Sequence, residues 1–234
     1  MRPGAAAVLV STSLLVLAAG VPPTAAPPLP ARMADTGGGT QLITAQASSS
    51  GATSGTVTWW DLRDGTWTKA GSAAARFGAN GLVEGGSRKQ GTNTTPTGLY
   101  DLPYAFGIKP APGGTDVTYR PVRQNAWWCQ DNDSRSYNRW TEPRPADCRA
   151  AESEHLISYT QQYAHAYVIG FNYAQPVRKR GAGIFLHVNG RGATAGCVSV
   201  PVAAMRAILA WAEPGGRPHI AIGTTSGPTA ITRY

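Results

Sequence analysis

The chain has 234 residues, with 21 Lys and Arg against 13 Asp and Glu, so its formal net charge is +8. The basic residues are scattered and the aromatic residues form no stacking platform, so nucleic acid is not the expected partner; the charge suits an anionic polymer or serves solubility alone. Because 28 Gly and 18 Pro interrupt short runs of β-branched and aromatic residues, the composition indicates a mainly β protein.

The first element in chain order is a predicted signal peptide over residues 1–26. Met1 and Arg2 give a positive start, residues 5–19 are apolar and uncharged, and small residues follow. The apolar run is shorter than the ~20 residues of a membrane span. We therefore expect export with no stable membrane span after cleavage, a retained anchor being the minor alternative. Residues 27–40, rich in Pro and Gly, are expected to form a linker.

A single domain is expected over residues 41–226, followed by a tail at 227–234. Residues 95–98 predict a turn. The only strong helical period covers residues 202–212, with Pro201 at its start and Pro-Gly-Gly after its end. Strands are predicted at 41–46, 56–62, 66–69, 82–83, 99–102, 163–172, 184–188 and 219–222. Asp64-Gly65 is a hairpin turn signal that joins the second and third of these.

A polar, Trp-rich segment from about 106 to 150 is predicted to be an insertion that either faces a ligand or packs on the sheet as a structural flap. Cys129 and Cys148 flank its central part and are the natural disulfide pair in an exported protein, worth about 3 kcal/mol for a loop of this length. This pairing leaves Cys197 as a free thiol. A buried, inert Cys197 or a different pairing are the alternatives.

His187 ends a predicted strand, and Cys197 follows ten positions later, after a Gly-rich loop. A histidine within reach of a thiol can take its proton and make the sulfur nucleophilic. Gly196 permits close backbone approach, and amides near it could bind an oxyanion, at ~3 kcal/mol per donor. The alternative is a hairpin turning at 189–190, with His187 and Cys197 as ordinary sheet residues.

The segment around Cys197 resembles the YkuD-like L,D-transpeptidase catalytic domain of bacterial cell-wall enzymes. That family's signature is a His at a strand end, a loop, then Ser/Thr-His-Gly-Cys and an apolar residue, which here corresponds to His187, residues 194–197 and Val198. Residues 95–100, Thr-Pro-Thr-Gly-Leu-Tyr, are similar to the family's Thr-Pro-x-Gly-x-aromatic stretch. The resemblance covers about 41–223. It implies a mainly β, sandwich-like fold with one helix packed beside the catalytic segment, and agrees with the pattern of predicted elements.

The resemblance also assigns roles to residues near the thiol. Cys197 would be the nucleophile and His187 its general base, oriented by the backbone carbonyl of Val188. Gly196 and the amide of Cys197 would form the oxyanion hole, and Thr194 would shape the pocket.

Three departures from the family pattern concern the substrate side of this site. Ala195 replaces the second His, Ser199 stands where Asn or Arg is common, and the His-to-Cys loop is shorter than in the best-known members. These changes put the acceptor site and its hydrogen bonding in doubt while sparing the nucleophile and the base. In that loop Arg191 is the candidate to hold a substrate carboxylate; a solvated charge is the alternative.

The implied reaction is acyl transfer on peptidoglycan stem peptides by a secreted or wall-associated monomer of the bacterial cell envelope. The thiol attacks the carbonyl before a terminal D-residue, that residue leaves, and the thioester passes to an amine of a neighbouring stem. An L,D-carboxypeptidase, in which water replaces the amine, and a non-catalytic envelope-binding module remain open. No cofactor is expected. No metal is expected either, since His155, His165 and His219 lack Cys or acidic partners at ligand spacing.

Overall fold

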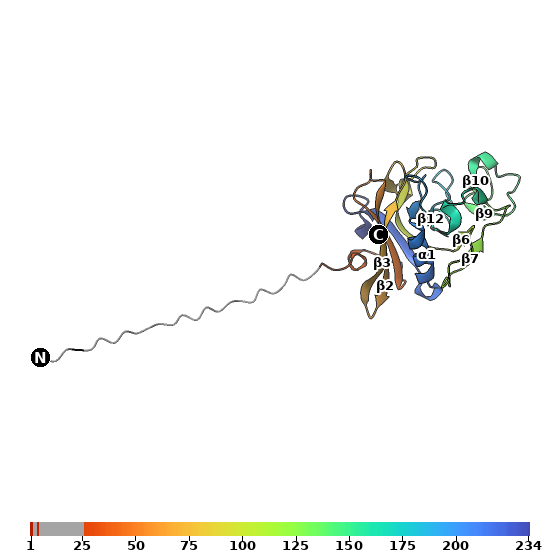
Figure 1. Cartoon of the computed structure of the whole chain (residues 1–234). Coiled ribbons are helices and arrows are strands. Elements are labelled where there is room, and N and C mark those ends of the chain that lie inside the picture. Colours follow the sequence, from red (N-terminus) through yellow and green to blue (C-terminus); the bar gives the residue numbers. More distant parts are fainter. Residues whose placement is uncertain (2–3, 5–25) are drawn as a thin grey trace.

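A computed structural model describes residues 1, 4 and 26–234, so most of the predicted signal peptide lies outside the described residues (Figure 1). A mixed sheet of eleven strands runs in the order β4-β5-β14-β1-β2-β3-β13-β12-β11-β6-β7, and a separate sheet has the order β10-β8-β9. The predicted mainly β class is confirmed. The large sheet contains β1 Gln41–Ala47, β2 Ser54–Arg63, β3 Thr66–Arg76, β4 Leu82–Glu84, β5 Thr95–Asp101, β6 Ala105–Gly107, β7 Tyr119–Pro121, β11 Ala166–Val168, β12 Phe185–Val188, β13 Val198–Val200 and β14 His219–Thr224.

The hairpin of β2 and β3 turns at Asp64 and Gly65, both of which have positive φ. Strand β3 continues to Arg76, well beyond the predicted 66–69, because its backbone pairs along the whole length of β2. The stretch 95–98 belongs to strand β5 and is not the predicted turn. Residues 95–97 pair with β4, and β5 pairs with β14 on its other side. The backbone groups of this stretch therefore form hydrogen bonds within the sheet.

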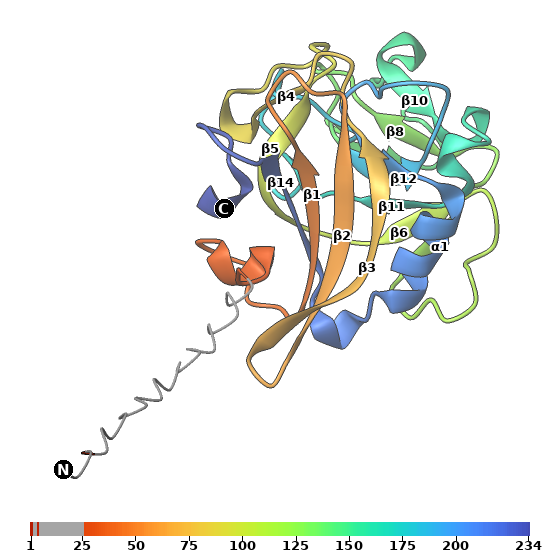
Figure 2. The same cartoon turned by 60° about the vertical axis from the view of Figure 1, so that its left-hand side comes forward.

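Helix α1, Val202–Trp211, confirms the helix predicted beside the catalytic segment, and it follows β13 directly. Ala204, Met205, Ile208 and Leu209 are its buried side chains, and they join the main hydrophobic core with strands of the large sheet. The helix lies alongside the sheet near β12 (Figure 2). None of the described helices is long and apolar enough to cross a membrane.

Residues near both ends of the described chain pack together. Leu29, in the short helix η1 (Leu29–Arg32), is buried in a cluster with Ile231 of η7 (Ile231–Arg233). The Ala34 amide donates to the Thr232 carbonyl at 3.1 Å. Part of the expected linker, and the expected tail, are therefore packed against the domain.

The insertion carries the second sheet, formed by β8 Trp127–Cys129, β9 Arg139–Thr141 and β10 Ser153–His155. The predicted disulfide between Cys129 and Cys148 is present, with 6.1 Å between the Cα atoms. Trp128 is fully buried and packs edge-on against Phe185 of β12, which favours the structural-flap interpretation of the Trp-rich segment. Because β10 pairs with β8, the insertion extends past residue 150.

Candidate functional site

His187 and Cys197 lie at neighbouring strands of the large sheet. Strands β12 and β13 are parallel, with His187 opposite Ser199, and Cys197 immediately precedes β13. The hairpin alternative is therefore wrong, because a hairpin would join antiparallel strands. Arg76 of β3 holds the connecting loop by donating from Nη1 to the Gly190 carbonyl at 2.7 Å.

The imidazole of His187 is held in one orientation. Its Nδ1 lies 2.8 Å from the Val188 carbonyl oxygen, and since a carbonyl can only accept, Nδ1 must carry the proton. This leaves Nε2 as a proton acceptor. Tyr163 packs on the ring edge-to-face, with 5.7 Å between ring centroids. Burial lowers the pKa of His187 to about 4, against a smaller raising effect of the Val188 hydrogen bond, so the imidazole is neutral at pH 7.

The thiol of Cys197 is buried and free, as predicted from the pairing of the other two cysteines. Its Sγ lies 3.4 Å from the Phe185 amide nitrogen and 3.4 Å from the Gly183 carbonyl oxygen. Burial raises the pKa of Cys197 to about 12, and the carboxyl of Glu154 adds to this effect. At rest the site therefore holds a neutral thiol and a neutral imidazole, and the charged pair must form during the reaction.

Two cavities meet at Cys197. The first, which we call the His187 cavity, has a volume of about 230 Å³ and is also lined by the predicted residues Arg191, Thr194 and Ala195. The second, the Arg88 cavity, has a volume of about 300 Å³. Cys197, Ala195 and Glu154 line both. Cys197 thus borders both cavities.

Ser199 belongs to neither cavity. It is fully buried on β13, and its hydroxyl is 2.8 Å from Oδ1 of Asn189 at the start of the connecting loop. It therefore contacts the loop and not the predicted substrate space. The other predicted residues surround Cys197, with Val188 contributing its backbone carbonyl.

Sequence reasoning missed Glu154, Tyr163 and Arg88. Glu154 comes from β10 of the insertion, and its carboxylate accepts hydrogen bonds from Gln130 Nε2 at 2.7 Å and from the Tyr163 hydroxyl. Burial raises the pKa of Glu154, and no cation pairs with it among the described residues. Tyr163 lies in η5 (Gln162–Ala164), where a strand was predicted, so its ring reaches both Glu154 and His187.

A family model described as the YkuD L,D-transpeptidase catalytic domain matches residues 52–220. The chain belongs to the YkuD family. No curated protein matches the chain. Among solved structures, that of Bdellovibrio bacteriovorus Bd1075 is similar at 17% identity with a TM-score of 0.38, covering 79% of this chain and 48% of that one. This chain thus spans about half the length of that structure's chain.

The predicted oxyanion donors of this YkuD domain are the amides of Gly196 and Cys197, and the Gly196 amide already donates a hydrogen bond. The Gly196 amide donates to the Thr194 hydroxyl at 3.1 Å, and that hydroxyl donates to the Cys197 carbonyl at 2.6 Å. An oxyanion role for the Gly196 amide requires the first of these bonds to break.

Around the YkuD site no group of three or more His, Cys, Asp or Glu able to hold a metal occurs in the described part of the chain.

The neutral resting state of this YkuD site predicts how a simple alkylating reagent will react. Iodoacetamide reacts with thiolates, and a thiol with a pKa of about 12 supplies about tenfold more thiolate for each pH unit up to that value. The rate of Cys197 alkylation should therefore rise steadily from pH 7 to pH 10, as measured by intact-protein mass spectrometry. A rate that levels off near neutral pH would mean that an ion pair already exists at rest.

Proposed function

We propose that this protein is a cysteine-dependent L,D-transpeptidase that acts on peptidoglycan stem peptides through a thioacyl-enzyme. The observation that carries this proposal is that a free thiol lines the same cavity as an imidazole whose Nδ1 is fixed on the Val188 carbonyl, and that a second cavity also borders Cys197. With the predicted signal peptide, this proposal includes a site of action in the bacterial cell envelope, secreted or associated with the wall, and a monomeric protein.

The first half of the reaction forms the acyl-enzyme. The Cys197 sulfur attacks the carbonyl carbon that precedes the terminal D-residue while its proton passes to Nε2 of His187. The amide of Cys197 stabilises the oxyanion. Collapse of this intermediate breaks the peptide bond, and the leaving amine takes the proton from His187. Because the thiol and the imidazole are neutral before attack, the positive imidazolium and the negative oxyanion form only during the attack. The Cys197 amide then stabilises the oxyanion.

The second half transfers the acyl group. An acceptor amine, whose proton passes to His187, attacks the thioester, and the Cys197 thiolate leaves and regains a proton. A reaction with two successive substrates needs space on two sides of the acyl group, and two cavities meet at Cys197. This geometry favours the transpeptidase over an L,D-carboxypeptidase, which needs only water. Packing of Trp128 into the core removes one support for a non-catalytic binding module.

Acylation can be tested with a carbapenem, an acyl donor that reacts with thiols of this kind. Wild-type protein should gain the mass of one carbapenem and Cys197→Ala should gain none. A disaccharide-tetrapeptide then separates the two enzymatic functions. Cross-linked dimers are expected; release of the terminal residue alone would show the carboxypeptidase instead. Absence of an adduct on folded wild-type protein, or an equal adduct on the variant, would exclude both.

A further inference from the structure

Arg88 is a buried cation without an ionic partner. Its side chain is 5% exposed, and its Nε and Nη1 donate to the carbonyl oxygens of Thr94 and Arg180 at 2.7 Å and 3.2 Å. No carboxylate of the described residues forms an ion pair with it, and its Nη2 has no hydrogen-bond partner among them. Burying a charge without an ionic partner is costly, and an anion in the cavity that Arg88 lines would offset this cost.

Two glycines make the space for this guanidinium. Gly181 and Gly196 both have positive φ, and a Cβ on them would lie only 1.7 Å from Nη1 and 2.7 Å from Nη2 of Arg88. Gly196 directly precedes the nucleophile Cys197. The free edge of the guanidinium therefore lies beside the backbone that carries the thiol, and the ring of Phe171 covers it at 5.6 Å.

The Arg88 cavity is lined by both basic and acidic side chains. Arg88 and Cys197 line it together with Glu152 and Glu154, which are contributed by the insertion. Carboxylates repel one another, so an anionic group in this cavity lies at the Arg88 end. Because burial favours the neutral form of Glu154, that repulsion is weaker than for two ionised groups.

We propose that Arg88 binds the free carboxylate of the donor peptide's terminal D-residue, the residue that leaves. This inference rests on the proposed function. A carboxylate can accept two parallel hydrogen bonds from a guanidinium, and this carboxylate is one residue away from the carbonyl that Cys197 attacks. Arg88 thereby sets specificity, because it selects donors that end in a free carboxylate one residue beyond the scissile bond. Arg191, exposed in the His187 cavity, is not needed for this contact.

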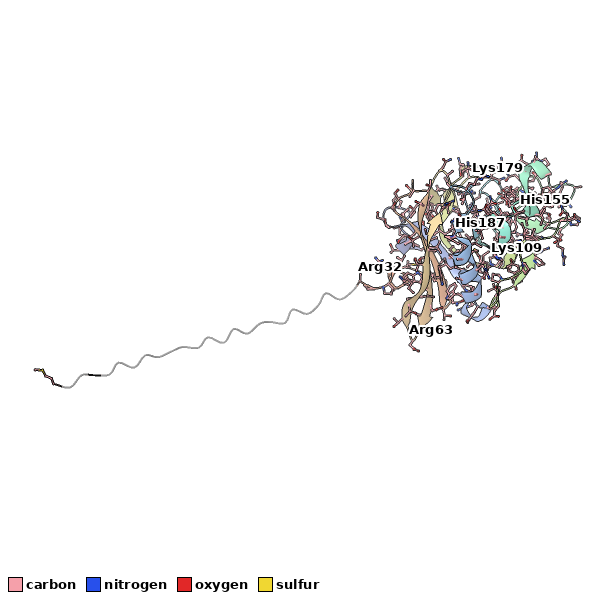
Figure 3. The ribbon with its side chains drawn as sticks, viewed as in Figure 1. Arg32, Arg63, Lys109, His155, Lys179 and His187 are labelled. Atoms are coloured by element: carbon pink, nitrogen blue, oxygen red, sulfur yellow. A yellow bond between two sulfur atoms is a disulfide. The ribbon has the colours of Figure 1, made fainter. Side chains whose placement is uncertain are left out.

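The first test uses two small alkylating reagents and does not depend on peptidoglycan chemistry. Iodoacetate and iodoacetamide transfer similar groups to Cys197, but only iodoacetate carries a carboxylate. The measured quantity is the rate of Cys197 alkylation by iodoacetate divided by the rate with iodoacetamide, relative to the same ratio for free cysteine. In wild-type protein this relative ratio should be ~10 or more, which corresponds to one charge-assisted hydrogen bond. Arg88→Gln should remove this preference. Arg63→Gln, a change of equal charge on the β2–β3 hairpin remote from His187, should keep it (Figure 3).

A wild-type ratio no greater than that of free cysteine would overturn the proposal without reference to any variant. So would an unchanged preference in Arg88→Gln. Should that variant fail to fold, Arg88→Lys keeps the charge but loses the paired geometry, and a reduced preference is then the expected result.

The second test uses three tetrapeptide donors, unmodified, amidated at the C-terminus, or amidated on a side-chain carboxylate of the preceding residue. Amidation of the C-terminus should lower kcat/KM of wild-type acylation by ~100-fold and have little effect on Arg88→Gln. The side-chain amide should match the unmodified peptide; the reverse pattern would overturn the assignment to the terminal carboxylate. If no peptide reacts while iodoacetate is still preferred, the proposed function fails and the anion site at Arg88 stands.

Discussion

The His187→Gln variant should lose ~10³-fold or more of its acylation rate at pH 7, within the range typical of a general base. Without the base, attack depends on preformed thiolate. Because the pKa of Cys197 is raised to about 12, only about one thiol in 10⁵ is ionised at pH 7. Stopped-flow measurement of carbapenem acylation gives this rate directly.

The pH dependence of this loss is the more specific result. In wild-type protein, His187 stays neutral down to about pH 4, so acylation should vary little between pH 6 and 9. In the variant, the rate should rise ~tenfold per pH unit as thiolate forms. The two rates should therefore converge toward alkaline pH. A deficit of constant size across this range would show that His187 orients other groups and does not take the proton.

Removal of the disulfide with the double variant Cys129→Ala/Cys148→Ala should lower the free energy of unfolding by about 3 kcal/mol. The two cysteines are 19 residues apart, and opening a loop of this length raises the entropy of the unfolded chain by about that amount. For a domain of this size we expect a Tm lower by roughly 6–12 °C in calorimetry. Cys197→Ala, which removes a buried sulfur but opens no loop, is the matched control and should shift Tm less.

Loss of the disulfide should also lower activity below the Tm. Cys129 is the last residue of β8, and β8 pairs with β10, the strand that carries Glu154. Glu154 lines both cavities at Cys197, so a loosened sheet no longer holds this side chain in place. Peptide turnover at 25 °C should fall while far-UV circular dichroism stays close to that of wild type. Unchanged turnover would mean that the cavities hold their shape without the insertion's covalent closure.

The parts of the fold that could be predicted from the sequence are those with local signals. Pro201 and the Pro-Gly-Gly after residue 213 bounded the helix, and Asp64-Gly65 marked the β2–β3 hairpin. The disulfide was predictable because the expected export favours paired cysteines, and Cys129 and Cys148 flank one short polar segment. The short segment between His187 and Cys197 likewise favoured a position for these two residues at neighbouring strands.

The remaining site residues had no such signal. Arg88 reaches Cys197 only because residues 95–97, close after it in the chain, pair with β4 and because Gly181 and Gly196 leave room for its head group. In the sequence it is one basic residue among many. Glu154 is placed by the pairing of β10 with β8, a contact made between distant segments of the insertion. Such residues are found only when the strand partners are known.

The burial of Cys197 has a consequence for how long the protein can remain active. Oxidants convert thiolates to sulfenic acid and beyond much faster than they attack protonated thiols. With its pKa raised to about 12 and its sulfur enclosed between the Phe185 amide and the Gly183 carbonyl, the resting thiol offers oxidants almost no thiolate. In surroundings oxidising enough to keep Cys129 and Cys148 paired, the Cys197 thiol should therefore stay reduced.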